Sequence, residues 1–211
     1  MAKNEERRRA IADAGIEVLA REGSRGLTHR AVDARAGVPI GTTSNYFRSR
    51  ESLIDGLIER IGERLAPTSE DLSRRETAAP GPELFADYVR DIVRRLTAHR
   101  DVTLALFELR LESARRPEVA AVLGAWQRAG FDADVAFNTG AGLPGGRSEI
   151  ALFHYAIDGL LLDRLTTPID PETSTDEIID GLVAGLLRPQ RRRSSSRPTD
   201  PAETHHELRV R

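Results

Sequence analysis

The 211-residue chain contains no cysteine. Disulfides, thiolate nucleophiles and cysteine-ligated zinc or iron–sulfur sites are therefore excluded, and the composition fits a reducing cytoplasm. Long apolar runs are also missing, because the longest ones fall far short of the roughly 20 residues that a membrane-spanning helix needs. The first residues, MAKNEERRRAIADAG, are charged and then amphipathic, unlike a secretory signal peptide. We therefore expect a cytoplasmic protein with no membrane partner.

Motifs that would indicate an enzyme are absent as well. The sequence has no GxSxG nucleophile elbow, no HExxH motif and no nucleophile beside an evident base. The glycine-rich stretch GAGLPGG at 140–146 lacks the preceding strand and the following Gly-Lys-Ser/Thr of a phosphate-binding loop, so we interpret it as an inter-helix loop. His205 and His206 could bind a metal only with further ligands. We expect no catalytic residue, no metal site and no cofactor.

The chain has no overall excess of positive charge, since 31 Lys and Arg face 33 Asp and Glu. The distribution along the chain is uneven. Residues 1–50 carry ten basic against six acidic side chains, residues 66–187 carry twelve against twenty, and residues 188–211 carry seven against three. A basic end joined to an acidic middle is typical of a DNA-contacting part linked to a part with another task, although random scatter of charge would give the same pattern.

Apolar residues recur at helical spacing through most of the chain, and no segment alternates with a period of two. We therefore predict an all-α fold. The predicted helices are 5–21, 29–35, 39–47, 50–65, 83–98, 102–115, 118–138, 148–165 and 175–187.

Two of these helices are short and lie close together. Thr28 can cap the first of them, and Gly37 can end it in a left-handed conformation. Pro39 suits the first turn of the second, which runs to about Phe47. Two short helices joined by a tight turn form a helix-turn-helix, whose second helix enters the major groove of DNA.

The second short helix lies in the stretch GTTSNYFRSRESLI. Short side chains suit a helix that enters a groove, and Thr42, Thr43 and Ser44 can offer hydroxyls to bases and methyl groups to thymine. Gly41 would let the backbone approach a phosphate, and Asn45 could bind adenine or a phosphate. The side chains suited to backbone contacts are Tyr46, Arg48 and Arg50. Phe47 and Leu53 are instead predicted to be core residues.

The run LTHRAVDARAGVPIGTTSNYFRSRESLI resembles the DNA-binding signature of the tetracycline-repressor (TetR) family of bacterial regulators, and RRRAIADAGIEVLAREG resembles its first helix. The resemblance covers residues 5–60. It implies a homodimeric repressor that binds a palindromic operator in double-stranded DNA, associates with the nucleoid when bound, and is controlled by a small apolar or amphipathic effector. The residues that it assigns to DNA are Thr28, His29, Arg30, Gly41, Thr42, Thr43, Ser44, Asn45, Tyr46, Arg48 and Arg50.

Three residues depart from the family pattern. Arg50 replaces the usual lysine, Pro39 stands where a capping Ser or Thr is frequent, and Ser44 stands where many members have tyrosine. The last change alters a residue that could touch bases, so it bears on operator specificity. We expect a helix-turn-helix DNA-binding domain at 1–65 and a helical ligand-binding and dimerisation domain at 66–188. The basic tail at 189–211 has almost no apolar content, so we expect it to be disordered.

The last two predicted helices carry more apolar surface than one bundle face needs. We expect them to pair across a two-fold axis, with interface residues Phe153, Ile157, Leu161, Ile178, Ile179, Leu182, Gly185 and Leu186. The alternative is that these helices form internal core. Large apolar side chains and embedded charges suggest an effector pocket built from Phe85, Tyr88, Phe107, Glu108, Leu111, Trp126, Phe131, His154, Tyr155 and Asp158. Core packing, a solvated face or internal ion pairs would explain most of them equally well.

Three functions remain open on the sequence. A ligand-responsive transcriptional regulator explains the most features. A helical enzyme or carrier would use the C-terminal region without DNA, and an architectural DNA binder would use the helix-turn-helix without an effector. Enrichment of a DNA sequence from a random pool separates the first and third from the second, and release of that DNA by a small molecule separates the first from the third.

Overall fold

The computed structural model describes residues 2–68 and 78–187, and within them it contains helices and no strands. The predicted all-α fold is confirmed. The helices are α1 (Ala2–Gly26), α2 (His29–Ala36), α3 (Thr42–Tyr46), α4 (Arg50–Leu65), α6 (Pro82–Ala98), α7 (Arg100–Ser113), α8 (Pro117–Gly140), α9 (Arg147–Leu165) and α10 (Thr175–Leu186). No described helix is long and apolar enough to cross a bilayer.

Side-chain caps and glycines set the helix ends. Thr28 Oγ1 accepts a hydrogen bond from Ala31 N (3.1 Å) at the start of α2, and Gly37 ends that helix at φ 63°. Ser49 begins α4 through reciprocal hydrogen bonds with Ser52, and Ser174 begins α10 in the same way with Glu177. These groups satisfy backbone donors and acceptors that a helix end otherwise leaves unpaired, so the limits of α2, α4 and α10 agree with the sequence prediction to within one residue. The third helix begins at Thr42 and not at Pro39, and α1 extends beyond the predicted 5–21 to Gly26, with non-helical backbone angles at Gly23.

The loop between α8 and α9 is held by a buried amide. Asn138 Nδ2 donates to the carbonyl oxygens of Leu143 (3.4 Å), Pro144 (3.3 Å) and Gly145 (2.9 Å). Gly145 adopts φ 89°, a conformation that favours glycine. Residues 141–146 therefore form an inter-helix loop, as predicted for this stretch, and backbone carbonyls of the loop accept hydrogen bonds from Asn138.

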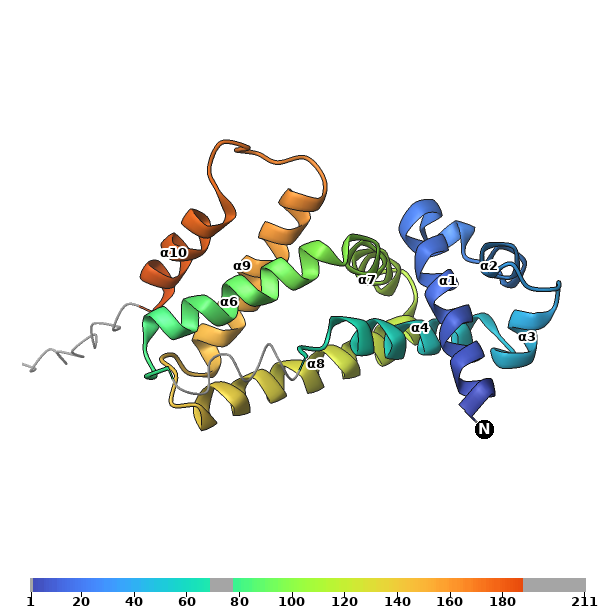
Figure 1. Cartoon of the computed structure of the whole chain (residues 1–211), viewed down its shortest axis with the longest axis horizontal. Coiled ribbons are helices and arrows are strands. Elements are labelled where there is room, and N and C mark those ends of the chain that lie inside the picture. The colour runs from blue at the N-terminus through green and yellow to red at the C-terminus, as the bar shows by residue number, and fades with distance from the viewer. Residues whose placement is uncertain (1, 69–77, 188–211) are drawn as a thin grey trace, which may run out of the picture.

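The molecule is elongated, with α2 and α3 at one end and α10 near the other (Figure 1). Two hydrophobic clusters fill it. The first combines α1, α2 and α4 with Val102, Ala105 and Leu109 of α7 and with Val119 and Leu123 of α8. The second combines α6, α9 and α10 with residues from α7 and α8. The first cluster therefore crosses the predicted domain boundary at residue 65, and α7 packs directly against α1. The predicted tail at 189–211 lies outside the described residues.

Candidate nucleic-acid interface

A buried carboxylate connects the two short helices. Asp33, on α2, is 1% exposed. Its Oδ2 accepts a hydrogen bond from Gly41 N (2.7 Å), and its Oδ1 accepts from Thr43 N (2.7 Å) and Thr43 Oγ1 (2.6 Å). Hydrogen bonds to an ionised acceptor are shorter and stronger than neutral ones, so this group holds the first turn of α3 firmly against α2.

The Asp33 contacts correct the prediction for Thr43 and Gly41. Thr43 is 0% exposed and its hydroxyl is committed to Asp33, so it faces the protein interior and does not offer a hydroxyl to bases. The Gly41 amide is likewise occupied by Asp33, so it is not free to receive a phosphate. Gly41 still needs to be glycine in this structure, because its φ is 90°. Both residues shape the recognition helix from within.

Two further residues that were predicted to contact DNA make internal contacts. His29 Nε2 lies 2.7 Å from the carbonyl oxygen of Phe47, at the end of α3, and donates to it. The Arg50 guanidinium donates to the carbonyl oxygens of Ser24 (2.7 Å) and Leu27, where α1 ends. Arg50 therefore points away from the DNA-facing surface and ties the start of α4 to the end of α1.

The Arg50 guanidinium also faces the C-terminal half of the chain. It lies 3.8 Å from Oε1 of Glu112, a buried residue on α7. The same Glu112 carboxylate binds Arg116 Nε at 2.6 Å. Glu112 on α7 therefore contacts two cations, Arg50 at the start of α4 and Arg116 just before α8. These contacts link the helix-turn-helix region electrostatically to α7.

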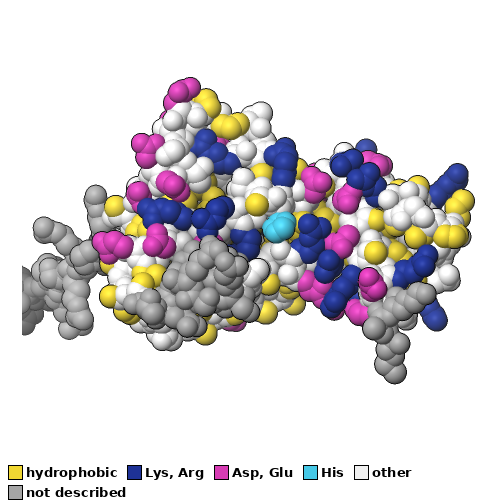
Figure 2. All heavy atoms as spheres, in the orientation of Figure 1, with side chains coloured by type: hydrophobic (Ala, Val, Ile, Leu, Met, Phe, Trp, Pro, Cys, Tyr) yellow, Lys and Arg dark blue, Asp and Glu magenta, His cyan; other side chains and the backbone are white. Residues whose placement is uncertain are grey.

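Of the remaining predicted contacts, Thr28, Arg30, Ser44, Asn45 and Arg48 are exposed. Thr42 and Tyr46 are half-buried: Thr42 Oγ1 donates to the carbonyl oxygen of Pro39 (2.6 Å), and Tyr46 packs against the first cluster. Among the described residues, no ion-pair partner contacts Arg30 or Arg48, whereas many other arginines of α1, α2 and α4 are paired internally. These paired arginines are Arg8, Arg9, Arg35, Arg60 and Arg64. Figure 2 shows Lys and Arg side chains beside apolar ones at the end of the molecule that carries α2 and α3.

Phe47 and Leu53 are buried in the first cluster, which confirms the prediction that they are core residues. Asp33 was missed by the sequence analysis, although an acidic residue on a short basic helix, eight positions before Gly41, is a signal that could have drawn attention to it.

The aromatic residues of the predicted effector pocket do not come together in one cavity. Phe85, Tyr88, Phe107 and Phe131 belong to the second cluster, whereas Trp126 packs against the first. Ring contacts join Phe85 to Phe153 (4.7 Å between centroids), Tyr88 to Phe137 (5.1 Å) and Phe131 to His154 (5.4 Å). Most of these rings therefore fill space between helices, which was the alternative interpretation.

The other predicted pocket residues are also dispersed. Leu111 and Tyr155 are exposed, and Glu108 lies beside Gly23 of α1. Asp158 forms an ion pair with Arg110 (2.5 Å), and His154 Nε2 lies 3.0 Å from Oδ2 of Asp134. Contacts within the chain therefore account for Asp158 and His154, as the alternative interpretation allowed.

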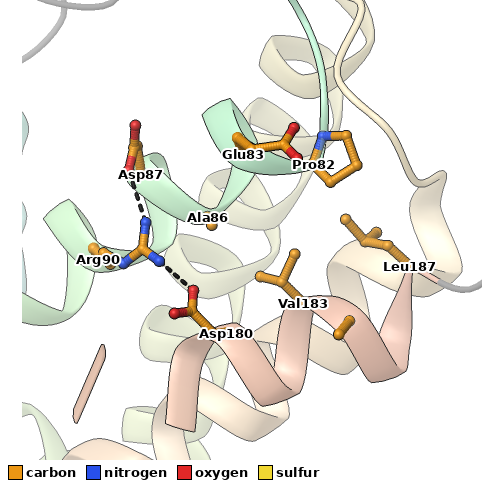
Figure 3. A pocket seen from close by; sticks show the side chains of 9 residues that line it. Pro82, Glu83, Ala86, Asp87, Arg90, Asp180, Val183 and Leu187 are labelled. Atoms are coloured by element: carbon orange, nitrogen blue, oxygen red, sulfur yellow. Dashed lines mark hydrogen bonds and ion pairs between the residues drawn. The ribbon is translucent and has the colours of Figure 1, made fainter. Parts of the chain in front are cut away.

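A surface groove of about 440 Å³ instead lies between α6 and α10 (Figure 3). Its apolar wall contains Ala86 and Val183, and its polar side contains Arg90, which binds Asp87 (2.8 Å) and Asp180. The full lining comprises Pro82, Glu83, Ala86, Asp87, Arg90, Asp180, Val183, Ala184 and Leu187. None of the predicted pocket residues is among them.

The predicted dimer residues divide into buried and surface groups. Phe153, Leu161 and Ile179 are 3% exposed or less within one chain, so they belong to its core and are not available to a partner. Ile157, Ile178, Leu182 and Leu186 are half-buried, and Gly185 is exposed. A different face of α9 carries the exposed residues Leu152, Tyr155, Gly159 and Leu162, whose helical spacing forms one stripe.

Comparison with known proteins agrees with this architecture. Residues 80–189 match the family model described as the tetracyclin repressor-like C-terminal domain, and residues 11–57 match that of bacterial regulatory proteins of the tetR family. The chain belongs to the TetR family. This TetR-family protein is a transcriptional regulator with a DNA-binding helix-turn-helix. Among curated proteins, no sequence matches it.

Several solved structures resemble this TetR-family protein over most of its length. The multidrug binding protein EbrR in complex with proflavin is 27% identical, with 86% of this chain and 99% of that chain covered and a TM-score of 0.57. A TetR-family member from Streptomyces coelicolor A3 is 25% identical, with 87% and 99% covered and a TM-score of 0.64. A transcriptional regulator from Rhodococcus sp. Rha1 is 22% identical and shares the fold, with 85% of this chain and 95% of that chain covered and a TM-score of 0.68.

The buried position of Thr43 predicts how its variants behave. Thr43→Val keeps the shape of the side chain but removes the hydroxyl donor to Asp33, so it should lower the free energy of unfolding by about 1–3 kcal/mol. It should weaken DNA binding without changing the preferred sequence. Urea unfolding and selection from a random DNA pool measure these two effects. The neighbouring exposed residue provides the control: Ser44→Ala should change stability by less than about 0.5 kcal/mol. A changed preference with unchanged stability in Thr43→Val would contradict the assignment.

The Asp33 carboxylate also predicts a pH dependence. Burial raises the pKa of Asp33, but hydrogen bonds from Thr43 and Gly41 and the nearby His29 outweigh it and lower the pKa below its ordinary value of 3.8. The ionised group therefore stabilises the fold above pH 3.8, and this stabilisation is lost as the pH falls through the lower folded value. Wild type should exceed Asp33→Asn in unfolding free energy at pH 7, and the difference should shrink below about pH 4. A difference that stays constant to pH 2.5 would contradict this.

Proposed function

We propose that the protein is a repressor that binds a palindromic operator as a homodimer and is released by a small-molecule effector. The observation that carries the proposal is the Asp33 anchor, which presents the outer face of α3 as a rigid surface. Arg30, on α2, and Arg48, just after α3, are exposed and have no ion-pair partner among the described residues. A fixed polar helix face together with unpaired cations on the same helix-turn-helix suits base contacts combined with phosphate contacts.

The DNA contacts are assigned from the surface residues only. Ser44 and Asn45 face outward from α3, so they are the proposed base-contacting residues. Thr28, Arg30 and Arg48 are proposed to bind phosphates and set the register of the helix in the groove. Thr42 and Tyr46, which are half-buried, would contribute at the edge of the interface.

The homodimer is proposed to form through the exposed stripe of α9. Leu152, Tyr155 and Leu162 expose apolar surface to water. Gly159 lies between them and would allow a partner helix to approach closely. On α10 the exposed residues include Gly181 and Gly185, where a partner helix would meet little steric hindrance. A two-fold pairing of such faces would place two α3 helices in the symmetric arrangement that a palindrome requires.

The effector is proposed to be a small apolar or amphipathic molecule, and the groove between α6 and α10 offers room for it. Carboxylates of Glu83, Asp87 and Asp180 outnumber the single cation Arg90 there, which favours an apolar body with a positive group. The similarity to EbrR, solved with proflavin, supports a small-molecule effector. Binding would reach the DNA-binding helices through α7, which packs against both α6 and α1 and carries Glu112, the contact of Arg50, and it would shift the population between two arrangements.

Selection of DNA by the purified full chain tests the proposal. Incubation with a random duplex pool at moderate salt, followed by sequencing of the bound fraction, should return a two-fold symmetric site. Arg48→Ala should weaken binding to all sequences and reduce the salt slope by about one per half-site, because a phosphate contact is lost. Arg128→Ala, which removes an exposed arginine from α8, serves as its matched control and should leave both affinity and slope unchanged.

The symmetry of the selected site depends on the dimer, so the dimer face has its own variant. Leu162→Arg places a charge in the α9 stripe and should yield a monomer in sedimentation that protects only half of the site. If the wild type enriched no sequence, or if it enriched an asymmetric site bound by a monomer, the proposed function would be wrong.

A further inference from the structure

One large apolar side chain stands in the helix-turn-helix without a packing role. Ile40 is 81% exposed, although it lies in the turn directly before α3. Full burial of an isoleucine side chain stabilises a fold by about 1.5–3 kcal/mol, and the exposed Ile40 contributes almost none of this free energy. The stability of a single chain therefore gives no reason for isoleucine here.

The exposure of Ile40 does not come from a loose loop. On one side, Val38 N donates to the carbonyl oxygen of Asp33 (3.0 Å). On the other, Thr42 N donates to the carbonyl oxygen of Pro39 (3.1 Å), and Gly41 N donates to the Asp33 carboxylate. The backbone on both sides of Ile40 is tied to the same buried residue, so the side chain is held outward at a fixed place.

The surroundings of Ile40 select among possible partners. The exposed residues of α3, which begins two positions after Ile40, are the polar Ser44 and Asn45, and Arg30 and Arg48 are exposed on the same helix-turn-helix. A protein or lipid surface would require a large contiguous apolar patch, which Ile40 and the exposed Pro39 beside it do not provide. A polyanion that carries isolated apolar groups matches better, and the C5 methyl of thymine is such a group in the major groove of DNA.

We propose that Ile40 reads the C5 methyl group of a thymine and so helps to determine the operator sequence. This inference rests on the proposed function, because it assumes that α3 enters the major groove. It assigns a specificity-determining role to a residue that lies outside the recognition helix itself. The contact is apolar, so it adds sequence preference without a hydrogen bond and without a phosphate contact.

Replacement of thymine by deoxyuridine tests the proposal, because it deletes the methyl group and leaves every hydrogen-bonding group in place. Each thymine of the selected site is replaced in turn, and the dissociation constant is measured for wild type and for Ile40→Ala. In the wild type, each half-site should contain one thymine whose single replacement raises the dissociation constant about fourfold. This factor corresponds to the transfer free energy of one buried carbon group. Ile40→Ala should bind the thymine and deoxyuridine versions of that position equally.

Ile169→Ala is the matched control. Ile169 is 93% exposed in the connection between α9 and α10, so its replacement removes the same atoms from a surface remote from α3. This variant should keep wild-type affinity and wild-type sensitivity to deoxyuridine. Thermal unfolding of both variants should match the wild type, since neither side chain is packed.

Three outcomes would overturn the proposal. Wild type could be insensitive to every deoxyuridine replacement, Ile40→Ala could retain the wild-type sensitivity, or the selected site could contain no thymine. In each case a specific site would still have been selected, so the proposed function would stand. Failure to select any sequence would instead overturn the proposed function and this inference together.

Discussion

The arrangement of the DNA-binding surface depends on one buried carboxylate. Asp33 accepts three hydrogen bonds from the first turn of α3, and those donors are the amides of Gly41 and Thr43 and the Thr43 hydroxyl. A five-residue helix has too few internal hydrogen bonds to be stable alone. Its position must therefore come from contacts with α2, and an ionised acceptor with three donors supplies both the strength and the direction of that contact.

The same constraint separates structural from surface roles within α3. Because Thr43 turns inward to Asp33 and Phe47 is packed in the first cluster, Ser44 and Asn45 are left facing outward. His29 holds the other end of the helix through the Phe47 carbonyl. Hydrogen bonds from α2 at both ends of α3 leave little freedom for the helix to tilt independently. A change in DNA affinity would then involve movement of the whole helix-turn-helix, and the contacts of Arg50 with Glu112 and of α1 with α7 connect that unit to the rest of the chain.

The sequence predicted the limits of α2, α4 and α10 well because the ends of these helices depend on local groups. Thr28, Gly37, Ser49 and Ser174 each act within a few residues of their own position. The roles of individual side chains were harder to predict when the partner lies elsewhere. Arg50 looked like a phosphate contact from its place beside α3, but its acceptors are carbonyls at the end of α1 and a carboxylate on α7. Sequence spacing cannot show such a partner, since it depends on how distant helices pack. The effector site shows the same limit. Size and apolar character predicted that the aromatic residues line one effector pocket. In the structure most of them are packed between helices, and the groove is lined by smaller residues of α6 and α10.

Hydrogen exchange of the Gly41 and Thr43 amides tests the central role of Asp33 most directly. Both amides donate to the carboxylate, so in the wild type they should exchange as slowly as amides in the middle of α4. In Asp33→Asn both should exchange at least about tenfold faster, because a charge-assisted acceptor has been replaced by a neutral group. Exchange of both amides at the rate of an unstructured chain in the wild type, or unchanged protection in Asp33→Asn, would contradict the account of how α3 is held.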